Sequence, residues 1–257
     1  MVAILVVAKW FLLLMFYSFI GWVYESIVCS IEEKRLINRG FLNGPICPVY
    51  GFGGLLVITL LYNRIDNVLL LFLGCMLLTT TLEYITAIIL EKMFDARWWD
   101  YSSYPLNFQG RICLLGAVVF GVLATLTLRY LHPFTLQILE SMQEWIVLSV
   151  AGVLVLLVSI DIFVTVRHLL RLNGRLQTIQ QQVNQFMEKH MKRAEGLKST
   201  LLERFEESEF YTEQVKRLFD LGKRQNMRLL RAFPKLRPIH NNEAWQWLKS
   251  KLLSKDK

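Results

Sequence analysis

The sequence predicts an all-α, polytopic membrane protein with about five spans, built as a duplicated hairpin plus one span and followed by a cytoplasmic coiled-coil-like helical tail. Three observations predict this fold class. The 257 residues are 54% hydrophobic and only 19% charged, and the mean hydropathy of +0.37 is too high for an ordinary soluble domain. Long apolar runs recur along the chain. One pattern of residues occurs twice.

Five apolar runs give the predicted spans, and four reach the roughly 20 residues that cross about 30 Å of hydrocarbon. The first lacks the basic start and cleavage site of a secretory signal, so we expect it to remain as a helix. The second is short, because prolines and glycines crowd its start. It is either a kinked full span or irregular backbone leading into a short helix. The runs are Ala3 to Val28, Val49 to Tyr62, Val68 to Leu90, Ile112 to Tyr130 and Trp145 to Val166.

Basic residues predict the orientation, because cytoplasmic connections carry an excess of Lys and Arg. Only Arg64 and Arg129 lie on the opposite connections. We therefore expect an inner (plasma) membrane protein with its N-terminus outside and its C-terminus in the cytoplasm. The residues assigned to the cytoplasmic side are Lys34, Arg35, Arg39, Lys92, Arg97 and Arg111.

The chain divides into a predicted transmembrane domain, residues 1–168 with repeat halves at about 10–62 and 68–130, and a basic helical tail, residues 169–257. From Arg167 onwards there are 20 Lys and Arg against 10 Asp and Glu, a charge that suits anionic lipid. Nucleic acid is not the expected partner. In the tail, a stripe of residues recurs at alternating steps of three and four, which fits a coiled-coil seam. This seam could pair with another subunit or with a second helix at about Ser199 to Arg231. The stripe comprises Leu169, Leu172, Leu176, Ile179, Val183, Phe186 and His190.

Two glutamates lie inside apolar, membrane-length runs, each eight residues before a Glu-Lys pair and upstream of a Gly-x-Ile-Cys step. An ionised carboxylate in hydrocarbon costs several kcal/mol, so Glu25 and Glu83 are expected to have a use. They either tie helices together through Arg111, Arg39 or nearby hydroxyls, or form a site for a proton, a cation or a cationic substrate. Both fall in the inner half of the bilayer by the predicted orientation.

The connection between the third and fourth runs is rich in aromatic residues. It is either an interfacial anchor or a loop that also covers a site. Arg111 could bind an anionic group or neutralise Glu83. Asp161 is interpreted as lying at the end of its helix. The candidate residues of the connection are Trp98, Trp99, Asp100 and Tyr101.

The sequence holds no motif of a soluble enzyme, so no catalytic residue, cofactor or metal is expected. It has no Walker A loop, no Gly-x-Ser-x-Gly elbow and no His-Glu-x-x-His motif, and its four histidines lack metal-ligand spacing. Four cysteines lie in or beside apolar runs without a Cys-x-x-Cys pair, which favours small core residues over a disulfide framework.

Several motifs agree in order with one bacterial membrane family. They are Gly-Trp-x-Tyr-Glu at 21–25, the string from Asn38 to Gly53, Leu82-Glu83-Tyr84, the string from Arg97 to Ser102, and the string from Asn107 to Leu114. Over about residues 10–135 the chain resembles the putative ABC-transporter type IV, or putative ABC-transporter permease, family. The resemblance implies transport with a separate ATPase subunit. The competing hypothesis is a non-transporting scaffold or sensor whose tail binds a partner or anionic lipid.

Overall fold

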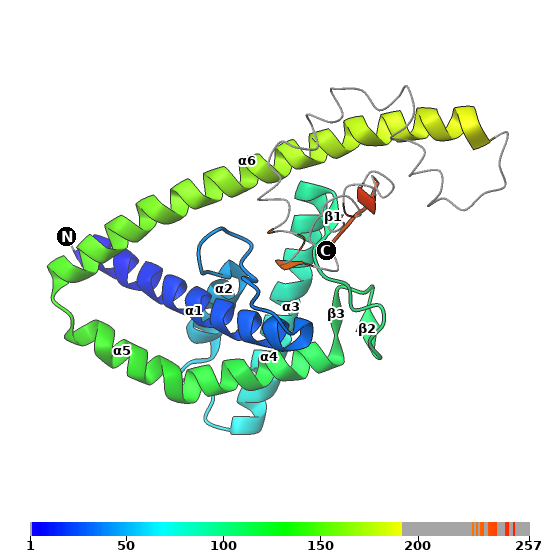
Figure 1. The fold of residues 1–257 in the computed structure, drawn as a ribbon. Coiled ribbons are helices and arrows are strands. Elements are labelled where there is room, and N and C mark those ends of the chain that lie inside the picture. Colours follow the sequence, from blue (N-terminus) through cyan, green and yellow to red (C-terminus); the bar gives the residue numbers. More distant parts are fainter. Residues whose placement is uncertain are drawn as a thin grey trace. The chain divides into compact units, whose positions relative to one another are not determined.

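The computed structural model is mainly helical and describes residues 2–191, 228, 230, 232–233, 236–240, 245–246 and 249 (Figure 1). Its long elements are α1 (Val2–Glu33), α2 (Pro48–Leu61), α3 (Val68–Phe94), α4 (Leu114–Leu126), the π-helix η1 (Thr127–Leu131), α5 (His132–Ser141) and α6 (Glu144–Met191). Two small antiparallel pairs join β1 (Ala96–Arg97) to β4 (Arg237–Pro238) and β2 (Asn107–Phe108) to β3 (Ile112–Cys113).

Within the described residues, four helical stretches are long and apolar enough to cross a membrane: Val2–Ile31, Val68–Phe94, Leu114–Ser141 and Glu144–Gln182. Much of their apolar surface is exposed, as at Val153, Leu156 and Phe163 of α6, which fits helices surrounded by lipid. The helical membrane class is thus confirmed. The predicted second span is the 14-residue helix α2, which at 1.5 Å per residue covers about 21 Å. The five-span count therefore stays a prediction.

Two helices extend beyond their apolar runs. The fourth stretch continues through η1 and α5, and Pro133 explains the π-helical turn. Proline lacks a backbone donor and its ring displaces the carbonyl four residues earlier, so the preceding turn widens. Helix α6 continues as one helix of 48 residues, so residue 168, the predicted domain boundary, lies within it.

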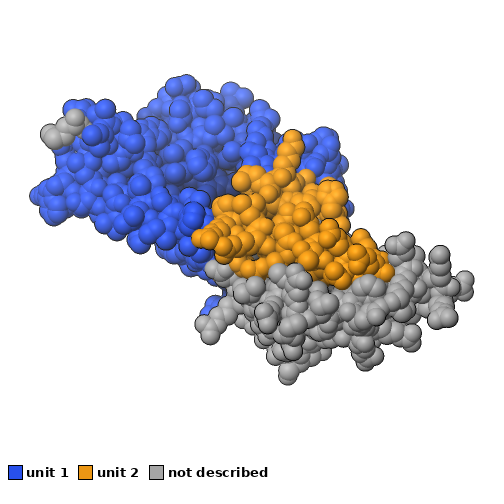
Figure 2. Space-filling view, turned by 90° about the horizontal axis from the view of Figure 1, so that it is seen from above, with its two compact units in different colours: residues 1–89, 99–165 blue, residues 90–98, 166–257 orange. Residues whose placement is uncertain are grey.

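The chain forms two compact units (Figure 2). Unit 1 comprises residues 1–89 and 99–165, and unit 2 comprises residues 90–98 and 166–257. In unit 2, β1 pairs with β4, and the Trp98 ring lies edge-on to Phe233 at 4.9 Å. Four residues of the predicted tail stripe are buried there, whereas their coiled-coil pairing stays a prediction. Those residues are Leu169, Leu172, Leu176 and Ile179. Apart from Arg228 and Leu230, the predicted second tail helix lies outside the described residues.

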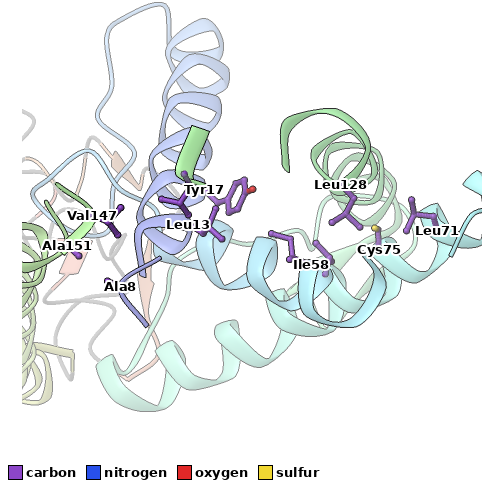
Figure 3. Close-up of a cluster of buried hydrophobic side chains, with 11 residues drawn as sticks. Ala8, Leu13, Tyr17, Ile58, Leu71, Cys75, Leu128, Val147 and Ala151 are labelled. Atoms are coloured by element: carbon purple, nitrogen blue, oxygen red, sulfur yellow. The ribbon is translucent and has the colours of Figure 1, made fainter. Parts of the chain in front are cut away.

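The core of unit 1 is an apolar cluster of buried side chains from α1, α2, α3, η1, α5 and α6 (Figure 3). Close packing of α1 and α2 depends on glycine: a Cβ at Gly51 would lie 2.2 Å from Ser18 Oγ and 2.5 Å from the Leu14 carbonyl oxygen. A Cβ at Gly21 would lie 2.2 Å from Cγ of Tyr50. Small residues let membrane helices approach in this way, and here they fix the first turns of α2 against α1.

Candidate functional site

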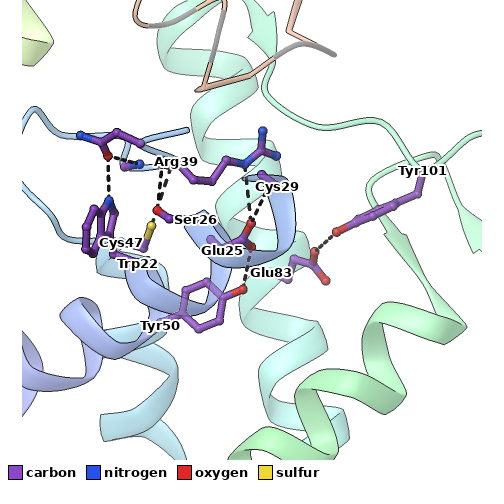
Figure 4. Close-up of polar contacts among 11 residues, drawn as sticks. Trp22, Glu25, Ser26, Cys29, Arg39, Cys47, Tyr50, Glu83 and Tyr101 are labelled. Atoms are coloured by element: carbon purple, nitrogen blue, oxygen red, sulfur yellow. Dashed lines mark hydrogen bonds and ion pairs between the residues drawn. The ribbon is translucent and has the colours of Figure 1, made fainter. Parts of the chain in front are cut away.

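Glu25 is held from two sides in unit 1 (Figure 4). Its Oε2 lies 3.6 Å from Nε of Arg39, and its Oε1 accepts a hydrogen bond of 2.6 Å from the hydroxyl of Tyr50. Tyr50 reaches it because α2 begins beside α1 and the Tyr50 ring lies over Gly21. The guanidinium and the hydroxyl together neutralise and solvate the carboxylate, as a charge in an apolar surrounding requires.

Arg39 lies on the irregular segment between α1 and α2, and side chains of α1 hold that segment. Its backbone N–H donates to Ser26 Oγ at 3.3 Å, and the backbone N–H of Ile37 donates to Ser30 Oγ at 3.0 Å. The Cys47 thiol donates to the Arg39 carbonyl at 3.9 Å. Burial raises the pKa of the Cys47 thiol to about 12, and the nearby Glu25 carboxylate adds to the effect. Cys47 is therefore a neutral hydrogen-bond donor.

Asp161 of α6 anchors the same segment further along. Its carboxylate accepts hydrogen bonds from the backbone N–H of Asn43 at 3.0 Å, from that of Gly44 at 2.7 Å, and from Asn43 Nδ2 at 2.8 Å. The Thr165 hydroxyl adds a bond of 3.1 Å. The interpretation of Asp161 as a helix-end residue is wrong, because α6 continues for 30 residues beyond it. A charged acceptor inside the helix is retained because it satisfies backbone donors that no regular structure pairs.

Glu83 of α3 is 7% exposed, and its Oε1 accepts a hydrogen bond of 3.1 Å from the hydroxyl of Tyr101. Burial raises the pKa of Tyr101, and the carboxylates of Glu83 and Glu25 raise it further, so this hydroxyl keeps its proton and donates it. Figure 4 shows the two carboxylates in one region of unit 1, Glu25 on α1 and Glu83 on α3.

The other predicted residues of the connection lie around this tyrosine. Trp99 donates its indole N–H to the Arg111 carbonyl at 2.9 Å, and the Asp100 carboxylate accepts from Ser102 N at 2.9 Å, which shapes the turn before Tyr101. The guanidinium of Arg111 bonds to Gln109 and lies 5.8 Å from the centre of the Tyr84 ring.

Trp98 differs from its neighbours because it belongs to unit 2. It is 3% exposed and packs edge-on against Phe94 at 5.8 Å.

Within the described residues no group of three or more His, Cys, Asp and Glu could hold a metal ion.

The contacts of two residues at the site, Tyr50 and Asp161, were not predicted from the sequence. Tyr50 lies in the Pro and Gly-rich start of the short helix, where the surrounding residues indicate a turn. Asp161 bonds to Asn43 across 118 positions of sequence. An aspartate inside an apolar run is the one available signal for this second contact, by the same cost argument that singles out Glu25 and Glu83.

The membrane-length apolar helices define the class of the chain as a multi-pass helical membrane protein. A family model described as putative ABC-transporter type IV matches residues 12–166, more than half of the chain, and the chain belongs to this family. The resemblance seen in the sequence is thereby confirmed, and the match extends through Asp161. No curated protein and no solved structure matches the chain.

Proposed function

We propose that the chain is the permease component of an ABC-type transporter in the inner membrane, with its acidic site toward the cytoplasmic side. The observation that carries the proposal is the pair of carboxylates, half-buried Glu25 and buried Glu83, on two membrane-length helices of one compact unit. Intramembrane acids are costly and mark ion or substrate pathways. The family description supports transport as the purpose.

The permease role requires a separate ATPase subunit, because the sequence contains no Walker A loop. The proposed orientation puts the basic connections and the tail in the cytoplasm, where such a subunit would bind. In this orientation the irregular segment before α2 and the connection that carries Tyr101 both lie at the cytoplasmic ends of their helices. Each of these segments supplies a tyrosine or an arginine to a carboxylate.

The test compares a strain that lacks the chain with strains that express the wild type, Glu25→Gln or Glu83→Gln. We expect the wild type to restore the distribution of small solutes between cells and medium, measured by mass spectrometry, and each Gln variant to fail at equal protein level in the membrane. Glu140→Gln, at an exposed position of α5, is the matched control and should behave as the wild type. Gln variants that do not accumulate in the membrane would instead support a purely structural tie between helices.

The second candidate function is a membrane scaffold or sensor, which the contacts within unit 2 favour. In that unit the returning tail pairs with residues 90–98: Ile239 N–H donates to the Asp95 carbonyl at 2.8 Å, and His240 Nδ1 lies 2.6 Å from the Asp95 carboxylate. Deleting Arg171 to Lys257 separates the two functions, provided that membrane levels are matched. A permease should keep membrane activity without the tail, whereas a scaffold should lose its phenotype completely.

A further inference from the structure

The two carboxylates of the site differ in how they are compensated. Glu25 has a cationic partner, Arg39, at 3.6 Å and a hydroxyl donor, Tyr50, at 2.6 Å, and its side chain is 27% exposed. Glu25 therefore has a partner at each of its two carboxylate oxygens. It has little to gain from binding a further cation, because the ligand would have to displace Arg39.

Glu83 is more deeply buried and is incompletely satisfied. Tyr101 donates to its Oε1, but its Oε2 has no hydrogen-bond partner among the described residues. Three residues earlier, the hydroxyl oxygen of Thr80 is also buried and has no hydrogen-bond partner in the part of the chain that the structure describes. Residues three positions apart project from the same side of a helix, so α3 presents two unsatisfied oxygens together. Buried polar atoms without partners are rare and costly, which marks this place for a ligand.

We infer that Glu83 is the exchangeable acid of the site and takes up a single proton at Oε2, while Glu25 stays paired with Arg39. This inference deepens the proposed function and rests on it, because it assigns a ligand to the same site. The proton forms one O–H bond on Oε2 and removes one negative charge, and no other bond changes. Tyr101 continues to donate to Oε1, and the new O–H faces the side of α3 that carries Thr80.

A proton fits this place better than a metal ion. Hard metal ions collect six or more oxygen ligands, and no group of three metal-binding side chains exists within the described residues. With Glu25 paired to Arg39, Glu83 adds one uncompensated negative charge, which one proton cancels. The ionisable groups on the elements around Glu83 include Glu25 of α1, Arg39 of the following segment, Tyr50 of α2, Tyr84 of α3, Tyr101 and Arg111 of the connection after α3, and Cys113 of β3.

The test is infrared difference spectroscopy of the full chain in lipid nanodiscs, titrated with acid and base at constant salt. A protonated carboxyl gives a carbonyl stretching band that an ionised one lacks. Among the bands of all the carboxyls, we expect one that disappears as the pH rises, that the spectrum of Glu83→Gln lacks, and that Glu25→Gln and Glu140→Gln keep. Tyr101→Phe should keep the band and shift its frequency, since it removes the hydroxyl that donates to Oε1.

Two results would overturn the inference: a set of pH-dependent bands that is the same in Glu83→Gln as in the wild type, or removal of the Glu83 band by sodium, potassium or ammonium at fixed pH. The second result would make the site a cation site. Because the readout needs no transport, it is separable from the proposed function. A Glu83 band in a protein whose Gln variants restore solute distribution would refute the permease role and leave the proton site in place.

Discussion

The contact between α1 and α2 gives the sharpest test of how the fold positions the site. In Gly51→Ala the added methyl group would lie 2.2 Å from Ser18 Oγ and 2.5 Å from the Leu14 carbonyl oxygen, whereas a comfortable carbon contact is about 3.5–4.0 Å. Backbone cannot turn aside as a flexible side chain can, so the helices must separate. Overpacking of this kind costs about 1–3 kcal/mol.

Gly152→Ala in α6 is the matched control, because, outside its own helix backbone, no atom of the described residues lies within 4 Å of its added methyl group. Both variants gain the helix propensity of Ala over Gly, about 1 kcal/mol, so the difference between them isolates the clash. We expect the free energy of unfolding, measured by denaturing-detergent titration in mixed micelles, to be about 1–3 kcal/mol lower for Gly51→Ala than for Gly152→Ala. Equal stability of the two variants would refute the close approach of α1 and α2.

Three further predictions concern the segments around the site. Asp161→Ala should lower the free energy of unfolding by about 1–3 kcal/mol and abolish the exchange protection of the Asn43 and Gly44 amides. Hydrogen exchange followed by mass spectrometry measures this protection, and retained protection would contradict the anchoring role. Cys47, with its thiol pKa raised to about 12, should remain protonated and resist iodoacetamide at pH 8 in the folded protein, and should become thiolate only as the pH rises toward that value. Rapid alkylation of Cys47 at pH 8, compared with the denatured chain as a control, would count against its burial. An impermeant maleimide on intact cells should label Asp66→Cys but label Ser103→Cys only after permeabilisation, since both positions are exposed and lie on opposite connections; the reverse pattern would invert the orientation.

Much of the helical framework could be predicted because a bilayer constrains length and polarity. The runs Ala3 to Val28 and Val68 to Leu90 lie within α1 and α3. Irregular backbone over Asn43 to Gly54 was one of the two alternatives for the second run; the chain is irregular only as far as Cys47, and Pro48 and the glycines after it belong to α2. The ends of α5 and α6 were not predictable from hydropathy, because a helix does not stop where its sequence becomes polar.

The sequence predicted the two carboxylates of the candidate site, but not the side chains that donate hydrogen bonds to them. The cost of a carboxylate in hydrocarbon identifies Glu25 and Glu83 whatever the tertiary fold. Their hydrogen-bond donors come from irregular segments, whose paths depend on contacts such as those of Asp161 with Asn43 and Gly44. No local pattern shows that Tyr101 turns toward Glu83 while Trp98, three residues earlier, packs into unit 2.

The unequal surroundings of Glu25 and Glu83 bear on how such a site could work. Each accepts a tyrosine hydroxyl, yet Glu25 also has Arg39, whose segment is fastened to α1 by serine hydroxyls. Glu83 depends on one hydroxyl from a connection whose turn is closed by local hydrogen bonds. Separating that connection from α3 would remove the sole described donor of Glu83 and leave the partners of Glu25 in place. A change in the connection after α3 would therefore alter the free energy of charging Glu83 selectively, because a buried carboxylate is stabilised mainly by its donors.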